Sequence, residues 1–288
     1  MILLLLLFLS SAFAELHVFH LMGTYAFVEL PEGKAYEAYR YMKSLEEKLS
    51  DYIESSEVSA INREAGKNYV RVSEETLEVI EKALEVSRKT YGVFDITAGA
   101  LTIRSWRLKE ISEEEAKKLI NYKDVVVKGR DVLLRKKGMA IDLGGIGKGF
   151  AVQKAYQHLK TAWGFIAIAG DMKVWGHSRL LAVEDPIKGG VLLEGYNKKD
   201  LCLSTSSNKD RRHIWGTETY VVQVTVAYDD CTFADAFATA LYAMTDQQRE
   251  RFLRENPHVG VLILYQDGSL YMNSSFRRYF QDLRLYNY

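Results

Sequence analysis

The stretch Ala140-Ile-Asp-Leu-Gly-Gly-Ile-Gly-Lys-Gly149 is the strongest local pattern in this chain of 288 residues. Its apolar start predicts a strand over 138–143. Its glycines predict a sharp bend after Asp142, and Lys148 opens a helix predicted over 148–160. Such a turn lets backbone N–H groups converge on an anion, and the helix N-terminus adds a favourable dipole. A tight strand–helix turn that needs glycine only for its geometry is the alternative explanation.

This turn would suit a phosphate group, but it differs from the known nucleotide-binding loops. Asp142 stands where a Walker A loop has its first glycine, and Gly149 replaces the Ser or Thr that would hold magnesium. The spacing also departs from the G-x-G-x-x-G fingerprint. No H-E-x-x-H, C-x-x-C or G-x-S-x-G motif occurs in the sequence, so the chemistries that depend on those motifs fit poorly.

Helix and strand patterns alternate irregularly on both sides of the turn. Spacing and capping residues predict helices over 34–49, from Ser73 to before Gly92, from Ser112 with Glu115, from Thr232 or Phe233 to about Met244, and from Asp246 to about Arg254. Strands are predicted within 17–30, 124–136, 165–169, 173–184, 191–196, 201–205, 221–228 and 259–273. The frequent hairpins favour an α+β fold, with mixed and largely antiparallel sheets flanked by helices. No internal repeat or low-complexity linker interrupts the chain, which favours a single domain over 15–288.

The first 14 residues differ from the rest of the chain. Met1 to Phe13 reads MILLLLLFLSSAF, and Ala12-Phe13-Ala14 fits the pattern of a signal-peptidase site. The apolar core is too short to span a bilayer. We therefore expect a signal peptide over 1–14 and an exported mature chain, without a transmembrane helix, in the periplasm or on the extracytoplasmic face of the membrane. A truncated start or a buried strand is the alternative interpretation.

Charge and cysteine content narrow the class of protein. Lys and Arg total 38 and Asp and Glu total 38, so the basic excess of a typical nucleic-acid binder is absent and no nucleic-acid partner is expected. Two cysteines are too few for a disulfide scaffold. Outside the cytoplasm Cys202 and Cys231 could pair, but two independent buried thiols fit the sequence equally well.

The segment Thr232-Phe-Ala-Asp-Ala-Phe-Ala-Thr239 contains a second candidate site. Asp235 and Thr239 are four residues apart, so their oxygens lie on one helical face. A carboxylate with a hydroxyl or carbonyl is a set of hard oxygen donors, which suits Mg²⁺ or Ca²⁺ better than Zn²⁺. An Asp that only complements the helix dipole is the alternative explanation.

Three other segments place a polar residue where it could act in chemistry or binding. Asp95 interrupts the apolar run 91–101, so its carboxyl group is either hydrogen-bonded inside the protein or faces a ligand. Tyr52, in the polar stretch 49–62, could provide a stacking ring. His213 follows two arginines and could be a base, although a surface histidine is the commoner explanation.

Taken together and in this order, these segments resemble the ApbE family of FAD:protein FMN transferases, from about Leu21 to Phe276. Met22-Gly-Thr24 is similar to the family's opening M-G-T, and LSDYIESSEVSAIN to its S-x-Y-x-x-x-S-x-[LIV]-x-x-[LIF]-N segment. GVFDITAGAL resembles G-x-[FM]-D-[IV]-T-x-G-x-L, and IDLGGIGKGFAV resembles D-L-G-G-I-[AG]-K-G-[YF]-A-[VA]. Ala169-Gly170-Asp171 and Ala234-Asp235-Ala236 follow at the expected places.

The resemblance implies an ApbE-like fold and a magnesium-dependent reaction. FMN would be transferred from FAD, through a phosphoester bond, to a Ser or Thr hydroxyl of an acceptor protein, with release of AMP. The acceptor would be an exported or membrane-attached redox subunit. The residues that would line the FAD site are Met22, Tyr52, Val93, Phe94, Asp95, Asp142 and Lys148. Mg²⁺ would be held by the Gly145 carbonyl, Asp235 and Thr239, and His213 matches the family's catalytic base.

The chain departs from the family pattern at three places. After His213 the family usually has a D-P-x-T-G stretch, which this chain replaces with Ile214-Trp-Gly-Thr-Glu-Thr-Tyr220, and this departure concerns acceptor recognition. Gln153 replaces the usual Asp of the A-V-D element. Ala169 replaces the first Gly of G-G-D. Two other functions stay compatible with the sequence. One is an FAD pyrophosphatase, which uses water as the nucleophile and yields FMN and AMP. The other is a non-catalytic extracytoplasmic flavin-binding protein.

Overall fold

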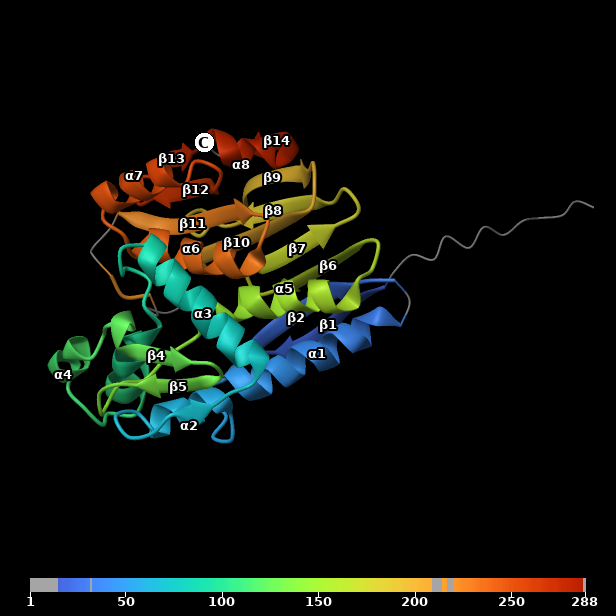
Figure 1. The fold of residues 1–288 in the computed structure, drawn as a ribbon. Helices are drawn as coiled ribbons and strands as arrows, with labels where there is room; N and C mark the ends of the chain where they lie inside the picture. Colours follow the sequence, from blue (N-terminus) through green and yellow to red (C-terminus); the bar gives the residue numbers. More distant parts are fainter. Residues whose placement is uncertain (1–14, 32, 209–213, 217–219, 287–288) are drawn as a thin grey trace, which may run out of the picture.

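The computed structural model of the chain describes residues 15–31, 33–208, 214–216 and 220–286. An eight-stranded sheet has the order β1-β2-β6-β7-β10-β11-β12-β13, with every neighbouring pair antiparallel (Figure 1). Its strands are β1 (Leu16–Leu21), β2 (Thr24–Glu29), β6 (Gly164–Ile168), β7 (Asp171–Trp175), β10 (Leu201–Ser207), β11 (Val221–Tyr228), β12 (Gly260–Tyr265) and β13 (Leu270–Met272). Two three-stranded antiparallel sheets consist of β14 (Phe280–Leu285), β9 (Val191–Asn197) and β8 (Leu180–Glu184), and of β3 (Val70–Arg71), β5 (Asp131–Leu134) and β4 (Val125–Lys128).

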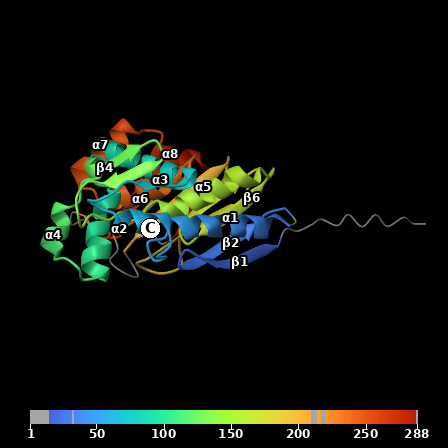
Figure 2. The same cartoon turned by 60° about the horizontal axis from the view of Figure 1, so that its bottom comes forward.

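Helices lie on both faces of the large sheet, and the longest of them share one face. The helices are α1 (Lys34–Leu49), α2 (Glu57–Arg63), α3 (Glu74–Lys89), α4 (Glu113–Lys118), α5 (Gly147–Leu159), α6 (Cys231–Ala243), α7 (Asp246–Glu255) and α8 (Ser274–Arg278). The 3₁₀ turns η1 (Ile96–Ala98) and η3 (Tyr122–Asp124) and the π-helix η2 (Ala100–Arg107) lie between α3 and β4. The turned view in Figure 2 shows α1, α3, α5 and α6 lying together on the same side of the sheet.

Side chains that alternate along the large sheet enter two separate cores. In β6, Ile166 and Ile168 pack with residues of α1, α5 and α6. Phe165 and Ala167, on the opposite face of the same strand, pack with residues of β8, β9 and α8. Both faces of the central strands are therefore buried, which explains why β6 is an almost continuous apolar run.

The expected α+β fold, with largely antiparallel sheets and flanking helices, is confirmed. Several of the predicted helix starts are confirmed in detail as well. The Ser73 hydroxyl accepts the Thr76 N–H, and Ser112 and Glu115 form the predicted capping box at the start of α4. Helix α6 begins at Cys231, because the preceding Asp230 side chain accepts the first free N–H groups of the helix.

The strand predicted over 138–143 is wrong. This segment belongs to none of the sheets in the described part of the chain. Its backbone is instead satisfied by a distant side chain and a turn, since Ile141 bonds to Asn62 and the Asp142 N–H donates to the Ile96 carbonyl. The apolar sequence of this segment is that of a buried strand, but its backbone bonds to a side chain and a turn instead of to a neighbouring strand.

Three further elements differ from the sequence-based predictions. The strand predicted over 173–184 is divided into β7 and β8 by a turn at Gly176, whose φ of 69° is left-handed. The polar stretch 49–62 contains α2, which is capped by the Ser56 side chain. Helix α8 and strand β14, which follow the last predicted hairpin, had no clear sequence pattern.

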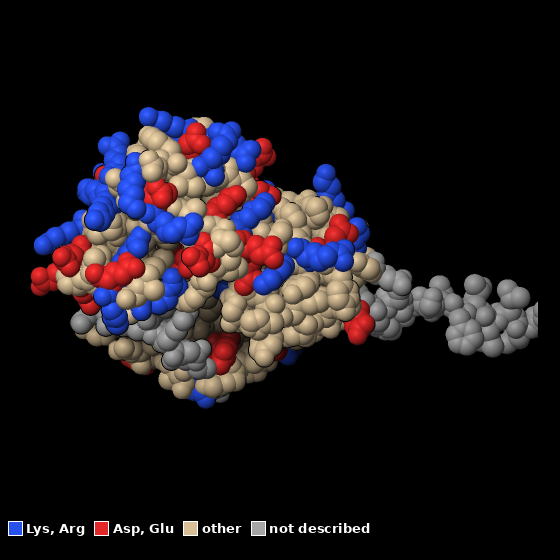
Figure 3. Space-filling model, turned by 90° about the horizontal axis from the view of Figure 1, so that it is seen from below, with Lys and Arg blue, Asp and Glu red and all other residues tan. Residues whose placement is uncertain are grey.

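Helix length and surface charge agree with the sequence in the described part of the chain. None of their helices is both long and apolar enough to cross a membrane. Seen from below in Figure 3, the surface mixes Lys and Arg with Asp and Glu, in keeping with the zero net charge.

Candidate active site

The glycine-rich turn 142–149 is held in place by segments that are distant in the sequence. Asn62 in α2 uses both ends of its amide on Ile141: its Nδ2 donates to the carbonyl oxygen at 3.0 Å, and its Oδ1 accepts the N–H at 2.7 Å. The Asp142 N–H donates to the Ile96 carbonyl oxygen at 2.8 Å. Asn62 and Ile141 are buried, so each broken bond would cost about 1–3 kcal/mol. The structure thus brings together the segments 49–62, 91–101 and 140–149.

Two glycines allow this turn to approach α6 and its neighbours closely. A Cβ added at Gly149 would lie 2.2 Å from the Cys231 carbonyl oxygen, so this position has no room for a side chain. A Cβ added at Gly145 would lie 3.1 Å from Thr239 Cγ2 and 3.2 Å from the Phe94 ring. Close packing therefore accounts for Gly149, and Gly145 brings its backbone next to the Thr239 hydroxyl.

Asp142 and Lys148, at the two ends of the turn, both have protein partners. Asp142 accepts the Gly144 N–H at 2.7 Å and the Thr102 hydroxyl at 2.6 Å. Lys148 Nζ donates to the Gly144 carbonyl at 3.3 Å and forms an ion pair with Asp171 Oδ2 at 3.1 Å. The Lys148 side chain is 27% exposed, so it can hold the turn and still contact a ligand.

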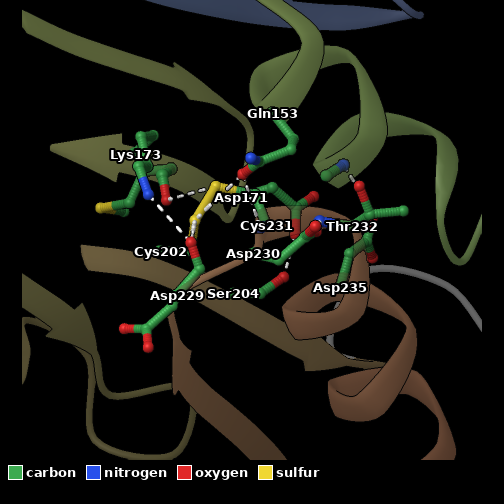
Figure 4. The surroundings of a disulfide bond; sticks show 12 residues. Gln153, Asp171, Lys173, Cys202, Ser204, Asp229, Asp230, Cys231, Thr232 and Asp235 are labelled. Carbon is green, nitrogen blue, oxygen red and sulfur yellow. Dashed lines mark hydrogen bonds between the residues drawn. A yellow bond between two sulfur atoms is a disulfide. The ribbon is translucent and has the colours of Figure 1, made fainter. Parts of the chain in front are cut away.

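Two buried carboxylates share the Lys148 ammonium (Figure 4 labels both of them). Asp235 Oδ2 lies 3.9 Å from Lys148 Nζ and accepts the Gly149 N–H at 2.9 Å. Burial and, after it, the Asp171 carboxylate raise the pKa of Asp235 to about 7, against the opposing effect of Lys148. Burial lowers the pKa of Lys148, but the Asp171 and Asp235 carboxylates outweigh it and hold that pKa above its usual value.

The face of α6 that carries Asp235 also carries a second hard oxygen donor, Thr239. Thr239 lies one helical turn further along α6, with its hydroxyl 3.3 Å from the Ser206 hydroxyl and next to Gly145. The structure therefore brings together the three predicted metal ligands, Gly145, Asp235 and Thr239. Within the described ranges, no group of three or more His, Cys, Asp or Glu side chains could hold a metal ion. A cation here would depend on one carboxylate together with hydroxyl and carbonyl oxygens.

The predicted flavin-site residues Val93, Phe94 and Asp95 lie in the turn after α3. The Phe94 ring touches the glycine turn, as described above, and Val93 is half-buried beside the main core. Asp95 accepts the Thr97 N–H at 2.8 Å, the Thr97 hydroxyl at 2.6 Å and the Tyr122 N–H at 2.7 Å. Burial raises the pKa of Asp95 despite these bonds. Its carboxylate thus holds the turn that presents Phe94.

Tyr52 lies on the surface loop that precedes α2. Its side chain is 73% exposed, and the Arg107 guanidinium lies 4.0 Å from the ring centre. Arg107 also forms an ion pair with Asp51 at 2.6 Å. Burial, with a further contribution from the nearby Asp142 carboxylate, raises the pKa of Asp51, so this loop lies close to the glycine turn.

Met22 lies in the turn between β1 and β2. Its φ of 51° is left-handed, and its N–H donates to Glu46 Oε1 at 2.9 Å. The β1–β2 hairpin is tied to the next turn of the sheet because the Ala169 N–H donates to the Tyr25 carbonyl at 3.2 Å. Met22 is thus placed at the same end of the sheet as Ala169-Gly170-Asp171.

His213, the predicted base, lies outside the described residues. The nearest described residue after it, Ile214, is held by Asn208, whose side chain accepts the Ile214 N–H and donates to its carbonyl, both at 3.0 Å. Gly216 packs against the end of α6, where an added Cβ would lie 2.6 Å from Ala243 Cβ. The described part of this segment therefore lies between β10 and the end of α6.

Sequence reasoning missed several residues that the structure places in the site. In the sequence, Asp171 stands out only as part of Ala169-Gly170-Asp171, whereas in the structure it is the ion-pair partner of Lys148. The Ser204 hydroxyl donates to Asp171, and Ser206 contacts Thr239. The polar residues at alternate positions of the apolar strand Leu201–Ser207 were the signal that could have revealed both serines.

The open question of the cysteines is answered by the structure. Cys202 and Cys231 form a disulfide, with both residues buried. Figure 4 shows the bond between β10 and the start of α6, close to Asp171, Ser204 and Asp235.

The ApbE family model matches residues 22–263. The chain belongs to the ApbE family. The family expected from the motifs is thereby confirmed. Among solved structures, the ApbE protein of Thermotoga maritima shares 26% identity at a TM-score of 0.81, over 93% of this chain and 100% of that one. The flavin transferase ApbE of Vibrio cholerae has the same fold, with a TM-score of 0.80 at 22% identity over 92% of this chain and 99% of that one.

Three relatives of the chain are named as FAD:protein FMN transferases, which confirms the enzyme class expected from the motifs. The protein of Vibrio cholerae serotype O1 named FAD:protein FMN transferase is 23% identical over 276 residues, which is 83% of this chain and 82% of the relative. A Treponema pallidum protein of the same name is 25% identical over 280 residues, which is 80% of this chain and 76% of the relative.

The raised pKa of Asp235 predicts how stability changes with pH in metal-free protein. Its pKa is about 7 in the folded chain against a reference value of 3.8. Because the folded state binds the proton more tightly, Asp235 lowers the free energy of unfolding progressively as pH rises from about 4 to 7. In urea titrations with a chelator, Asp235→Asn should gain on the order of 2–4 kcal/mol relative to the parent between pH 4 and 8.

The control is an exposed carboxylate that should change the free energy of unfolding with pH in the opposite direction. The Ser269 hydroxyl and N–H lower the pKa of Asp267, so Asp267→Asn should lose stability relative to the parent as pH rises to about 5 and should show no further change above that pH. The environment assigned to Asp235 would be contradicted if Asp235→Asn and the parent differed by the same free energy of unfolding at every pH from 4 to 8.

Proposed function

We propose that this chain is an FAD:protein FMN transferase that attaches FMN through a phosphoester bond to a Ser or Thr hydroxyl of an acceptor protein. The acceptor oxygen forms a bond to the FMN phosphorus, the pyrophosphate bond to AMP breaks, and the hydroxyl proton passes to a base. The proposal is carried by one observation in a chain of the ApbE family. Lys148, two buried carboxylates and the Thr239 hydroxyl cluster beside a glycine turn.

The same cluster supports Mg²⁺ as the cofactor. Lys148 supplies one positive charge between Asp171 and Asp235, which leaves a net negative charge for a cation to balance. Asp235, the Thr239 hydroxyl and the Gly145 carbonyl are hard oxygen donors of the kind that magnesium prefers, and they would hold the ion. When bound, Mg²⁺ would offset the negative charge of the pyrophosphate oxygens.

The flavin dinucleotide would bind over the turn. Lys148 is half-buried and aligned by Asp171, so it would contact a phosphate oxygen without losing many side-chain conformations. The ring of Tyr52 is an exposed aromatic surface on which a ring system of FAD could stack, whereas Phe94 is buried and would form part of the wall of the site. With these residues we assign Met22, Val93, Asp95 and Asp142 to the walls of the site.

A transfer assay tests this function directly. The chain is incubated with FAD, Mg²⁺ and a candidate acceptor domain, and flavin fluorescence of the acceptor band in a gel and AMP release are measured. Asp235→Ala should abolish transfer because it removes the carboxylate of the proposed metal site. Asp267→Ala, which removes an exposed carboxylate in the β12–β13 turn, should keep the parent rate.

The assay also separates the competing functions. Release of FMN and AMP without labelling of any acceptor would indicate an FAD pyrophosphatase. FAD binding without AMP release would indicate a non-catalytic flavin-binding protein. Equal transfer by Asp235→Ala and the parent would contradict the proposed metal site.

We assign the proton acceptor to His213 on the family resemblance. A general base contributes roughly 10²–10⁴-fold, so His213→Ala should lower the transfer rate by about that factor while FAD affinity changes little. The lower inflection of the rate–pH profile should disappear as well, because only the neutral imidazole accepts a proton. His258→Ala, at an exposed histidine, is the matched control. A His213→Ala variant that labels the acceptor at the parent rate would refute the role.

We further propose that the chain is exported and acts on an exported or membrane-attached redox subunit. The disulfide supports export, because such bonds persist mainly in oxidising compartments. The apolar start that ends in Ala12-Phe13-Ala14 supports removal of a leader. N-terminal sequencing of exported protein should find Glu15 or a near neighbour. An intact Met1 on exported protein would contradict this proposal.

A further inference from the structure

One face of strand β10 and one face of helix α6 meet along a row of paired residues. In a strand, alternate residues point to the same side, and in a helix residues four apart share a face. The three strand residues of this row are Cys202, Ser204 and Ser206, and the three helix residues are Cys231, Asp235 and Thr239. We call this row the β10–α6 ladder.

Strand and helix contact each other directly at the first and third levels of the β10–α6 ladder, and at the second level they are linked through Asp171 and Lys148. At the first level Cys202 and Cys231 are joined covalently. At the third level the Ser206 and Thr239 hydroxyl oxygens lie 3.3 Å apart. The second level is ionic, since Ser204 donates to Asp171, which shares Lys148 with Asp235.

The strand and the helix stay in register along the ladder because the spacing of alternate strand residues nearly matches the spacing of helix residues four apart. Two residues of a strand span about 6.6–6.8 Å, and four residues of a helix span about 6 Å. A helix anchored at one level therefore presents its next two levels opposite the strand. A rotation or slide of the helix at the first level would displace Asp235 and Thr239 together.

We propose that the Cys202–Cys231 disulfide positions the cation-binding oxygens by setting the register of α6 on β10. This inference rests on the proposed function, since it assigns Asp235 and Thr239 to a metal ion. Gln153 of α5 completes the anchor, because its Oε1 accepts the Cys231 N–H at 3.1 Å and lies 3.8 Å from the Cys202 sulfur. Helix α5 also carries Lys148. Gln153 and the disulfide therefore connect β10, α5 and α6, the three elements that carry the site (Figure 4).

The disulfide also stabilises the chain as a whole, because it connects residues 29 positions apart. The test must therefore separate a loss of register from a loss of stability. Leu192→Ala provides the control, since Leu192 is fully buried in the other core, between the large sheet and the β8–β9 pair. It should lower the melting temperature without touching the β10–α6 ladder.

The experiment compares the parent with Cys202→Ala/Cys231→Ala and Leu192→Ala, all below their melting temperatures. Binding of Mn²⁺, used as a paramagnetic probe for the magnesium site, is followed by electron paramagnetic resonance without FAD. Loss of groups that orient metal ligands typically weakens metal binding about 10–100-fold, so we expect a loss in this range for the double variant only. Ser206→Ala, which removes the third level and keeps the disulfide, should weaken Mn²⁺ binding as well.

The outcomes distinguish the two proposals. A double variant with the Mn²⁺ affinity of the parent, at a lower melting temperature, would overturn the positioning role and leave the proposed function intact. A parent protein that neither binds Mn²⁺ nor transfers FMN would overturn the proposed function, and the positioning role with it.

Reduction of the parent protein covers the case in which the double variant does not fold. A dithiol such as dithiothreitol supplies two electrons and two protons, so that the disulfide becomes two thiols and the reagent becomes a cyclic disulfide. Reduced parent, verified by thiol count, should stay folded and lose Mn²⁺ affinity. Unfolding of the double variant and the reduced parent alike would overturn the inference, because the bond would then hold the whole fold.

Discussion

The close approach of the glycine turn to helix α6 is the constraint on which the rest of the site depends. At Gly149 an added Cβ would lie 2.2 Å from the Cys231 carbonyl oxygen, so the two helix starts can meet only if this residue has no side chain. That approach lets the Gly149 N–H reach Asp235. It also places the first turn of α5, with Lys148, beside the first turns of α6, with Asp235 and, one turn on, Thr239.

The charges at this contact work against the stability of the metal-free chain. Asp171 and Asp235 are both buried, and one ammonium group lies between them. Burial and, after it, the neighbouring Asp171 carboxylate both favour the neutral form of Asp235, which is why its pKa is raised. In the proposed function, a bound cation would supply the positive charge that these two carboxylates lack.

The large sheet supplies the rigid frame for these groups. Its register pairs Ser204 directly with Asp171 across β10 and β7, so the hydroxyl that holds the carboxylate is positioned by backbone hydrogen bonds. Cores on both faces hold the central strands of the sheet. The residues that would contact a ligand lie on helices α5 and α6, which pack on this sheet, and in turns such as those of Met22 and Tyr52.

The sequence by itself determined the local elements, the family and most of the candidate site residues. Caps such as Ser73, hairpins such as 124–136 and the four-residue spacing of Asp235 and Thr239 act within one or two turns of chain, so they can be recognised without the fold. Only the tertiary structure decided which partners these residues have. Asn62 satisfies Ile141 from 79 residues away, Asp171 pairs with Lys148, and Cys202 meets Cys231. Those pairings depend on sheet register and helix packing, which form only when distant parts of the chain come together, and a linear pattern does not encode them.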